Sequence, residues 1–311
     1  MEQNKSNSKS SNPPKPFLKW AGGKTQLLDD IESYLPNNFR SEITKYFEPF
    51  VGGGAVFFRL ISKYDFDYIY LGDINGDLIL TYTVIRDNLD ELKILLRDLD
   101  KEYYEKSELE RKEMFYTTRE DFNIIHCKGS KIPTKNHVEI ASKMIFLNKT
   151  CFNGLYRVNQ KGSFNVPFAN PKKPLIYDER NLSKVSLALE NVNIEHADYH
   201  KSIKNMDEHS FVYLDPPYKP INGKKYFEGY SKSSFNDDNQ RELKDFCIKI
   251  NDEKHAKFIL HNSDPTNFNK NDCFFEDLYK DFNKVPVYAK RSINSDAKKR
   301  GNIRELLIYN F

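Results

Sequence analysis

The chain has 311 residues, of which 48 are basic and 45 acidic, and its formal net charge is +3. This length can bury a large core in one or two domains, and so small a net charge does not by itself indicate a nucleic-acid-binding protein. No apolar run is long enough to span a membrane, so we expect no membrane partner. The four cysteines lack the spacing of a zinc site, which predicts reduced thiols, a cytoplasmic location and no bound metal.

The first predicted feature is a glycine turn. Residues 1–15 are mostly polar and predict a disordered leader, and residues 19–25 then have the sequence KWAGGKT. This resembles a phosphate-binding loop, but Leu18 stands where that loop needs its first glycine. We therefore expect a tight turn into a helix at residues 26–31. Trp20 is either a core residue or, together with Lys24, part of a small-molecule site.

A strand, a second glycine loop and a helix are predicted next, at residues 45–61. Three consecutive glycines at 52–54 let the backbone approach a ligand, and the helix start offers free N–H groups. The next strand, 68–71, ends near Asp73, about 20 residues after the loop, as does the ribose acceptor of nucleoside-binding sheets. This spacing suits NAD as well as S-adenosylmethionine. Glu48, just before the loop, would repel a pyrophosphate but suits a sulfonium or an amino group.

A charged helical region and an aromatic loop follow. Residues 79–120 have apolar side chains at helical spacing, and we expect their charges to form a solvated face. A helix at 140–148 precedes the loop 149–168, which contains Asn-Gly and Lys-Gly turns. The alternative for this loop is a β-hairpin packed on its own aromatic residues. Its cations can contact phosphates or guanine, and its rings can stack on bases; the side chains concerned are Lys149, Phe152, Tyr156, Arg157 and Lys161.

The most specific stretch is a buried strand at 211–214 that runs into Asp215-Pro216-Pro217-Tyr218. The prolines end the strand, so Asp215 lies at a strand end, where open α/β sheets bind ligands. The Asp215 carboxylate and the Pro216 carbonyl offer two acceptors to an exocyclic amine. Such acceptors draw the nitrogen towards tetrahedral geometry and free its lone pair for reaction. Tyr218 can stack on the ring that carries the amine.

The other C-terminal segments predict the remainder of the sheet. A strand at 192–196 ends before Asp198, which is either a turn residue or an acceptor for an adenine amine. A polar stretch predicts a mobile loop over the site, and a basic loop near the end is either a clamp on the DNA backbone or a solvated hairpin tip. In chain order these predictions are a loop at 219–239, a helix at 241–250, a strand at 257–260, a basic loop at 290–301 and a strand at 305–309.

Taken in order, these motifs resemble those of the Dam-type, or alpha-class (D12 family), DNA adenine-N6 methyltransferases. The resemblance runs from about residue 16 to the C-terminus. The motifs that carry it are KWAGGK at 19–24, FEPFVGGG at 47–54, FNGLYR at 152–157, FNVP at 164–167 and DPPY at 215–218.

The resemblance implies a fold, an activity and partners. The fold is α/β, a doubly wound Rossmann-like S-adenosylmethionine-dependent methyltransferase domain at 16–80 and 190–311, with an inserted, mainly helical DNA-recognition domain at 81–189. The activity is methyl transfer from S-adenosylmethionine to N6 of adenine in double-stranded DNA, in the sequence GATC, by base flipping. The enzyme acts either alone or beside a cognate restriction endonuclease that cuts the same site.

The resemblance also assigns roles to residues. Phe152 stands where the family often has Tyr, which keeps the stacking surface and drops a hydroxyl contact. Ala197-Asp198-Tyr199 departs from the family's usual Gly-Asp-Phe, which puts the role of Asp198 in doubt. The implied catalytic residues are Asp215, Pro216, Pro217 and Tyr218. The implied cofactor-binding residues are Trp20, Lys24, Glu48, Pro49, Phe50, Gly52, Asp73, Asp198 and Asp215. The implied DNA-binding residues are Lys19, Phe152, Asn153, Leu155, Arg157 and Asn165.

Three alternatives stay open on the sequence. The same chemistry can act on cytosine N4 or on adenine in another sequence. A non-catalytic DNA-binding module with a degenerate methyltransferase fold is the second, and the intact DPPY sequence at 215–218 argues against it. The third is a nucleotide-hydrolysing enzyme, which the missing first glycine of the phosphate loop argues against.

Overall fold

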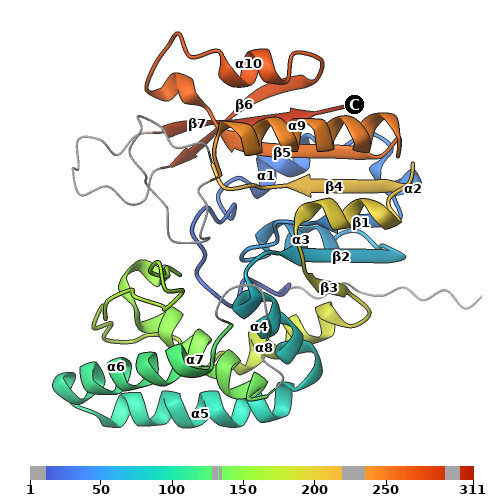
Figure 1. Cartoon of the computed structure of the whole chain (residues 1–311). Helices are drawn as coiled ribbons and strands as arrows, with labels where there is room; N and C mark the ends of the chain where they lie inside the picture. The colour runs from blue at the N-terminus through green and yellow to red at the C-terminus, as the bar shows by residue number, and fades with distance from the viewer. Residues whose placement is uncertain (1–11, 128–131, 133–134, 219–234, 291–301) are drawn as a thin grey trace, which may run out of the picture.

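The computed structural model describes residues 12–127, 132, 135–218, 235–290 and 302–311 (Figure 1). In this part of the chain a seven-stranded sheet has the order β3-β2-β1-β4-β5-β7-β6. Five neighbouring strands are parallel; β7 runs antiparallel to β5, and β6 antiparallel to β7. The strands are β1 (Lys45–Glu48), β2 (Tyr68–Asp73), β3 (Asn193–His196), β4 (Ser210–Leu214), β5 (Lys257–Ser263), β6 (Asn283–Lys290) and β7 (Asn302–Tyr309).

The strand order reverses between β1 and β4. From β1 the chain adds β2 and β3 on one side, whereas β4 and the later strands lie on the other side. Loops that leave the carboxyl ends of β1 and β4 therefore diverge and open a crevice, which is where α/β sheets bind ligands. Glu48 ends β1 and Asp215 directly follows β4, so the two predicted motifs meet at this switch point.

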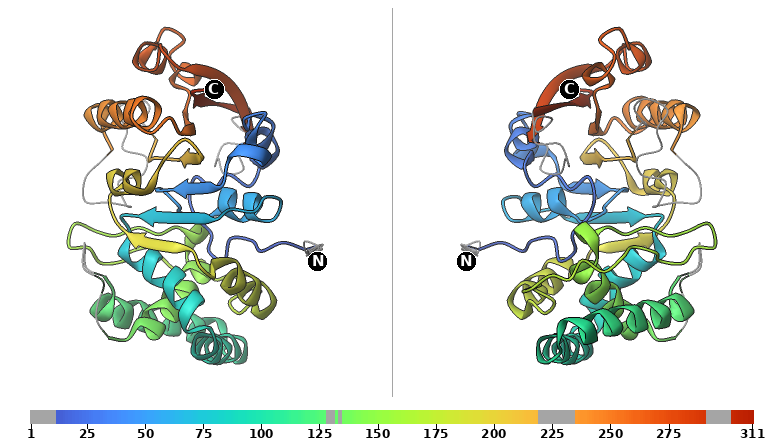
Figure 2. Two further views of the ribbon diagram at one scale, coloured as in Figure 1. Left: turned by 90° about the vertical axis from the view of Figure 1, so that its right-hand side faces the viewer. Right: turned by 90° about the vertical axis from the view of Figure 1, so that its left-hand side faces the viewer.

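Helices cover both faces of the sheet (Figure 2). Alternate residues of a strand point to opposite faces. Tyr46 of β1 and Tyr213 of β4 thus belong to one core cluster, and their neighbours Phe47 and Val212 belong to the other. The first cluster includes side chains of α1 (Leu28–Ser33), α2 (Phe39–Glu42) and α3 (Ala55–Ile61). The second includes side chains of α9 (Asp237–Asp252) and α10 (Phe274–Leu278).

A group of helices lies at the β3 end of the sheet (Figure 1). Its centre is α7 (His137–Thr150), which is buried along most of its length and packs on α4, α5 and α6. A capping box formed by Ser107 and Glu110 begins α6. The other helices of the group are α4 (Gly76–Asp87), α5 (Leu89–Glu105), α6 (Glu108–Ile125) and α8 (Glu179–Leu189). The predicted domain boundary at residue 80 falls inside α4, and the division of the chain into two domains stays a prediction.

The aromatic loop after α7 is hairpin-like, as one of the two interpretations predicted. Isolated antiparallel bridges join Cys151 to Phe168 and Val158 to Phe164. A short 3-10 turn, η1 (Phe152–Gly154), lies at its start, with Asn153 and Gly154 in the left-handed region. We call residues 151–168 the recognition hairpin.

Most predicted elements are confirmed with shifted ends. Residues 1–11 of the predicted leader lie outside the described residues, and within 12–15 the Lys15 backbone pairs with Asn181 of α8. The strand β6 was not predicted, because Pro286 interrupts its pattern. Proline is tolerated there because β6 is an edge strand. Most of the predicted basic loop at 290–301 and of the predicted loop at 219–239 lies outside the described residues; of the rest, Lys290 ends β6 and Asp237 begins α9. Across the described ranges, no helix has the length and apolar character to cross a membrane.

Candidate active site

A row of polar side chains crosses the strand ends on the face that α1 covers. Strand alternation puts Glu48 on the same face as Tyr46, and Asp215 on the same face as Tyr213. In β5 and β7 the same alternation, counted from buried Ile259 and Leu307, adds two more polar residues. We call the set the strand-end row; from β1 to β7 it comprises Glu48, Asp215, His261 and Glu305.

Lys24 lies at the centre of this row. Its turn is closed by a hydrogen bond from Gly23 N to Trp20 O, and Gly22 has a φ of 78°, which favours glycine. The Lys24 ammonium lies 2.7 Å from Asp215 Oδ2 and donates to Gly22 O at 2.5 Å. It also lies 4.8 Å from the centre of the Tyr218 ring. The Lys24 side chain is 5% exposed, so its ammonium group interacts with the neighbouring carboxylates away from solvent.

The Lys24–Asp215 pair leaves the aspartate as an acceptor. Burial raises the pKa of Asp215, while the Lys24 cation opposes that rise. The side chain of Asp215 is still 20% exposed, so a ligand can reach it. Behind it, the Pro217 carbonyl accepts from Gln240 at 3.4 Å, and the buried Asn262 donates to Gln240 at 3.1 Å. The turn after β4 is thus anchored to α9 and β5.

Glu305 joins Tyr218, the last residue of the DPPY sequence, to two buried side chains. It accepts from the Tyr218 hydroxyl at 2.7 Å and lies 2.7 Å from His261 Nε2. His261 Nδ1 lies 3.0 Å from the Tyr213 hydroxyl. Burial lowers the pKa of His261, so the imidazole is neutral near pH 7. Burial alone would raise the pKa of Glu305, but its His261 partner and the Lys24 cation hold it below the usual value.

Glu48 has the opposite electrostatic character from Glu305. Burial raises the pKa of Glu48 to about 8, although it accepts from the Tyr46 hydroxyl at 2.6 Å, and Asp215 nearby adds to the rise. The carboxyl group is 3% exposed. Near pH 7 it is therefore mostly protonated, and a cation placed beside it would favour its ionised form.

The other predicted cofactor residues lie around β2 and its neighbours. Asp73, the last residue of β2, accepts from Gly52 N at 3.2 Å and Asn75 N at 2.9 Å, and burial raises its pKa to about 6. A Cβ at Gly52 would come within 2.8 Å of the Trp20 ring, so only glycine lets these segments pack. Thus Trp20, Gly52 and Asp73 meet at one place, next to the Glu48 end of the row.

Three further predicted residues are near this place but differ in exposure. Pro49 is buried, and the half-buried Phe50 stacks on Tyr199 with ring centres 5.1 Å apart. Asp198, just beyond β3, is 57% exposed and pairs with His200 at 2.5 Å. It also accepts from the His200 backbone N–H, so it serves at least as the turn residue that the sequence allowed.

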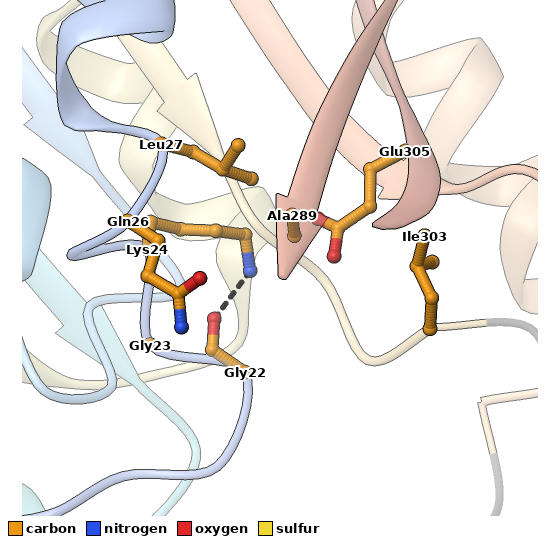
Figure 3. A pocket seen from close by; sticks show the side chains of 8 residues that line it. All are labelled: Gly22, Gly23, Lys24, Gln26, Leu27, Ala289, Ile303 and Glu305. Atoms are coloured by element: carbon orange, nitrogen blue, oxygen red, sulfur yellow. Dashed lines mark hydrogen bonds between the residues drawn. The ribbon is translucent and has the colours of Figure 1, made fainter. Parts of the chain in front are cut away.

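A cavity of about 180 Å³ opens on the β7 side of Lys24. Figure 3 shows Lys24 and Glu305 pointing toward one another from facing walls. The walls otherwise carry only small, apolar or amide groups: Gly22, Gly23, Gln26, Leu27, Ala289 and Ile303. The cavity is smaller than the roughly 300 Å³ of a typical ligand pocket, so it suits one ring system rather than a whole nucleotide.

The recognition hairpin presents its predicted DNA-contacting side chains to solvent. Phe152 is 53% exposed, although large apolar side chains are usually buried. Arg157 is exposed, and its guanidinium donates to Asn165 Oδ1 at 2.7 Å and to Asn165 O at 3.3 Å. Asn165 therefore orients Arg157. Asn153 is exposed and Leu155 half-buried.

Tyr156 does not fulfil its prediction as a ring that stacks on bases. It is 6% exposed, and its hydroxyl donates to Asp77 of α4 at 2.5 Å. Asp77 also pairs with the buried His126 at 2.9 Å. The Tyr156 ring stacks on Trp20 with centres 5.8 Å apart. Tyr156 thus anchors the hairpin to α4 and to the glycine turn instead of facing solvent.

Known proteins match the sequence of most of this chain. Residues 20–293 match the family of D12 class N6 adenine-specific DNA methyltransferases. The chain belongs to this family. It is 47% identical to the type II methyltransferase M.MjaIII of Methanocaldococcus jannaschii, over 96% of this chain and 99% of that protein. It is 33% identical to the DNA adenine methylase of Escherichia coli K12, over 94% of this chain and 93% of that protein. The predicted family and enzyme class are confirmed: the protein is an adenine-specific DNA methyltransferase.

The structure adds polar residues of this methyltransferase that the sequence did not single out. His261, Tyr46 and Tyr213 occupy fully buried positions of β5, β1 and β4, and Glu305 directly precedes the apolar run of β7. A polar group at a buried strand position is the signal that can find such residues, because burial without a partner is costly. Asn148, near the end of α7, is another: it is 3% exposed and bonds to three backbone groups.

Proposed function

We propose that this methyltransferase transfers the methyl group of S-adenosylmethionine to N6 of an adenine flipped out of double-stranded DNA, within GATC. The observation that carries this proposal is the Lys24–Asp215 pair at the switch point, with the Tyr218 ring beside it. This arrangement gives an exocyclic amine its acceptors and gives its ring a surface to stack on. The catalytic set is Asp215, Pro216, Pro217 and Tyr218.

The chain's own residues fit S-adenosylmethionine on the β1–β2 side. When bound, this cofactor supplies a methyl group activated by a positive sulfur. Asp73 would accept from the ribose hydroxyls, as an acid at the end of the second strand does in nucleoside-binding sheets. Glu48 and Asp215 would favour the positive charge, and Trp20 over Gly52 forms a flat wall that leaves room for no added Cβ. The cofactor set is completed by Lys24, Pro49, Phe50 and Asp198.

On the β4–β7 side the residues would hold the target base. Asp215 and the Pro216 carbonyl would each accept one hydrogen bond from the N6 amino group. These two bonds would draw the nitrogen towards tetrahedral geometry and free its lone pair. Lys24 keeps Asp215 in its acceptor form by opposing the pKa rise that burial causes. Tyr218 would stack on the purine, held from behind by Glu305. The cavity between Lys24 and Glu305 lies beside this placement, because Lys24 pairs with Asp215 and Glu305 accepts from Tyr218.

The exposed side chains of the recognition hairpin support binding to a duplex. Phe152 would wedge between base pairs to occupy the space of the flipped base. Arg157, oriented by Asn165, would read guanine. Lys19 would contact DNA from the glycine turn, and burial together with the neighbouring Lys19 cation lowers the pKa of Lys149. A phosphate beside these two cations would relieve their repulsion. Asn153 and Leu155 complete the DNA-binding set.

The helical group would be the recognition domain. We assign residues 81–189 to the recognition domain, and residues 16–80 and 190–311 to the catalytic domain. The reason is that the hairpin lies within 81–189, as do the side chains that anchor it, apart from those of α4 and the glycine turn. A cognate restriction endonuclease that cuts the same sequence is the functional partner we propose. The type II methyltransferase name of the relative in Methanocaldococcus jannaschii supports this context.

The test is methyl incorporation from labelled S-adenosylmethionine into two duplexes that differ only in GATC or GTTC. We expect label in the GATC duplex alone. Label in both duplexes would keep the enzyme class and move the target to another sequence or to cytosine N4. Label in neither, with cofactor binding shown by calorimetry, would contradict the proposed target and favour a DNA-binding module.

A further inference from the structure

Three asparagines each hold a distant backbone residue through a matched pair of hydrogen bonds. Asn181 of α8 accepts from Lys15 N and donates to Lys15 O, both at 2.9 Å. Asn148 of α7 accepts from Lys19 N at 2.9 Å and donates to Lys19 O at 2.8 Å. Asn123 of α6 accepts from Phe164 N at 2.7 Å and donates to Phe164 O at 3.1 Å. Two of these pairs fix the N-terminal segment, and one fixes the recognition hairpin.

Asn148 differs from the other two because it holds two segments at once. Its amide group also donates to Gly154 O in the recognition hairpin, at 2.9 Å. It is 3% exposed, so its three bonds form away from competing water. One side chain thus connects α7, the glycine turn at Lys19 and the start of the hairpin.

The two segments that Asn148 connects are also in direct contact. A Cβ at Gly154 would come within 2.4 Å of Lys19 Cβ, and the φ of Gly154 is 62°, so glycine is required for both reasons. Lys19 precedes Trp20, whose ring packs on Gly52 and stacks on Tyr156. The path from exposed Phe152 to the cofactor side therefore runs through Gly154, Asn148 and Lys19.

We propose that Asn148 is a positioning residue that couples target recognition to catalysis. It holds the hairpin and the glycine turn as one unit, so a duplex that fits the hairpin also fixes Trp20 and Lys24 in their places. This inference rests on the proposed function, because it takes the hairpin and Lys19 as the parts that read DNA. Without Asn148 the hairpin can adapt to a wrong sequence while the active site closes on its own.

The decisive experiment compares three matched variants: Asn148→Ala, Asn123→Ala and Asn181→Ala. Each loses one paired side-chain amide, but Asn123→Ala loosens only the hairpin and Asn181→Ala only the N-terminal segment. Initial methylation rates are measured on a GATC duplex and on a duplex whose first G·C pair is replaced by A·T. We expect the rate ratio between the two duplexes to fall about fivefold or more in Asn148→Ala, the scale of one base contact. The other two variants keep the wild-type ratio.

The rate ratio separates coupling from a purely structural role. A variant that is merely less stable has less active enzyme, which lowers both rates by the same factor and leaves their ratio unchanged. An unchanged ratio in folded Asn148→Ala would overturn the inference, and so would an equal fall in Asn123→Ala or Asn181→Ala. If wild type does not methylate the GATC duplex, the proposed target is wrong instead. If Asn148→Ala does not fold, the isosteric Asn148→Asp replaces it, since it keeps the acceptor for Lys19 N and loses both donated bonds.

Trp20 provides an independent readout because it is the chain's only tryptophan. Its fluorescence therefore reports the glycine turn together with the Tyr156 ring of the hairpin that stacks on it. We expect GATC duplex binding to change this fluorescence in wild type and in Asn123→Ala. In Asn148→Ala, at DNA concentrations shown by anisotropy to saturate binding, the DNA-induced change should be lost. A change as large as that of wild type would contradict coupling through Asn148.

Discussion

The strand-end row and the recognition hairpin are held in place by opposite means. Backbone ladders between β1, β4, β5 and β7 set the spacing of the strand-end row, and its side chains follow from strand alternation. The hairpin has only two isolated bridges, and side chains from outside hold it: Asn148, Asn123 and the Asp77–Tyr156 pair. The chemistry thus rests on a rigid scaffold, whereas recognition rests on a few replaceable anchors.

Because of this difference, substitutions in the two regions should have different effects on the enzyme. A change in the strand-end row alters the proposed catalytic Asp215 or the polar groups around it, so it should affect turnover on every sequence. A change at an exposed hairpin side chain that is proposed to contact DNA leaves that scaffold intact, so it should affect the choice among sequences. The predictions below test this division.

The largest effect should come from Asp215→Ala. Removing the acceptor for N6 should abolish detectable methyl transfer, and the fold should survive because the site lies at a strand end. Incorporation of labelled methyl groups and a thermal melt measure the two quantities. The matched control is Asp207→Ala, since Asp207 pairs with Lys45 at the other end of β4 and lies away from the site. Activity in folded Asp215→Ala protein would break the assignment of chemistry to the row.

A change in the hairpin, Arg157→Ala, should relax sequence choice more than it slows turnover on GATC. One arginine contact to guanine is worth about 1–3 kcal/mol of discrimination. Rates on GATC and on duplexes with single altered pairs measure it, with Arg97→Ala on α5 as the control. If discrimination is unchanged in Arg157→Ala, that residue does not read the base.

Glu305→Gln should have a smaller effect on turnover. Glutamine keeps an acceptor for the Tyr218 hydroxyl but removes the charge that strengthens the bond, so kcat should fall by about tenfold or less. The fall should be similar on GATC and on altered duplexes, because Glu305 belongs to the row. Glu276→Gln on α10 is the control. A loss of sequence discrimination in Glu305→Gln would contradict the view that the strand-end row affects turnover and the hairpin affects sequence choice.

The pH dependence of stability should reveal Glu48. Its pKa in the folded protein, about 8, lies above that of an unfolded glutamate, so the folded state binds the extra proton between these values. Stability should therefore fall as pH rises towards 8, by at most about 3 kcal/mol between pH 6 and pH 8. Asp73 and Asp215 contribute in the same direction, so the comparison is with Glu48→Gln. Denaturant unfolding of both proteins measures the slope, and parallel curves would contradict a protonated Glu48.

The sequence predicted Glu48 and Asp215 of the row better than Tyr156 of the hairpin, for a physical reason. A strand that ends in Asp215-Pro216-Pro217-Tyr218, and glycines before a helix, are local patterns that fix local geometry. The sheet order then brings Glu48 and Asp215 together without further information. Tyr156 shows the limit: its pattern suits base stacking, but a buried partner 79 positions away, Asp77, takes its hydroxyl.

Other features depended on tertiary contacts that no local pattern reveals. Asn148 lies in a helix, where a polar residue is usually solvated, yet here it is buried against Lys19 and Gly154. Glu305 stands next to Arg304 at the start of the apolar run of β7, where a charged residue is usually solvated, but here it lies against His261 and Tyr218. The strand β6 is interrupted by Pro286, which only an edge position allows.

The most direct test of the central claim is the identity of the methylated nucleoside. Duplex DNA is methylated by wild-type protein and by Asp215→Ala, digested to nucleosides and separated by chromatography with mass detection. We predict N6-methyladenine from the wild type, one per GATC strand at completion, and none from Asp215→Ala. Methylated cytosine from the wild type, or N6-methyladenine from Asp215→Ala, would contradict the account.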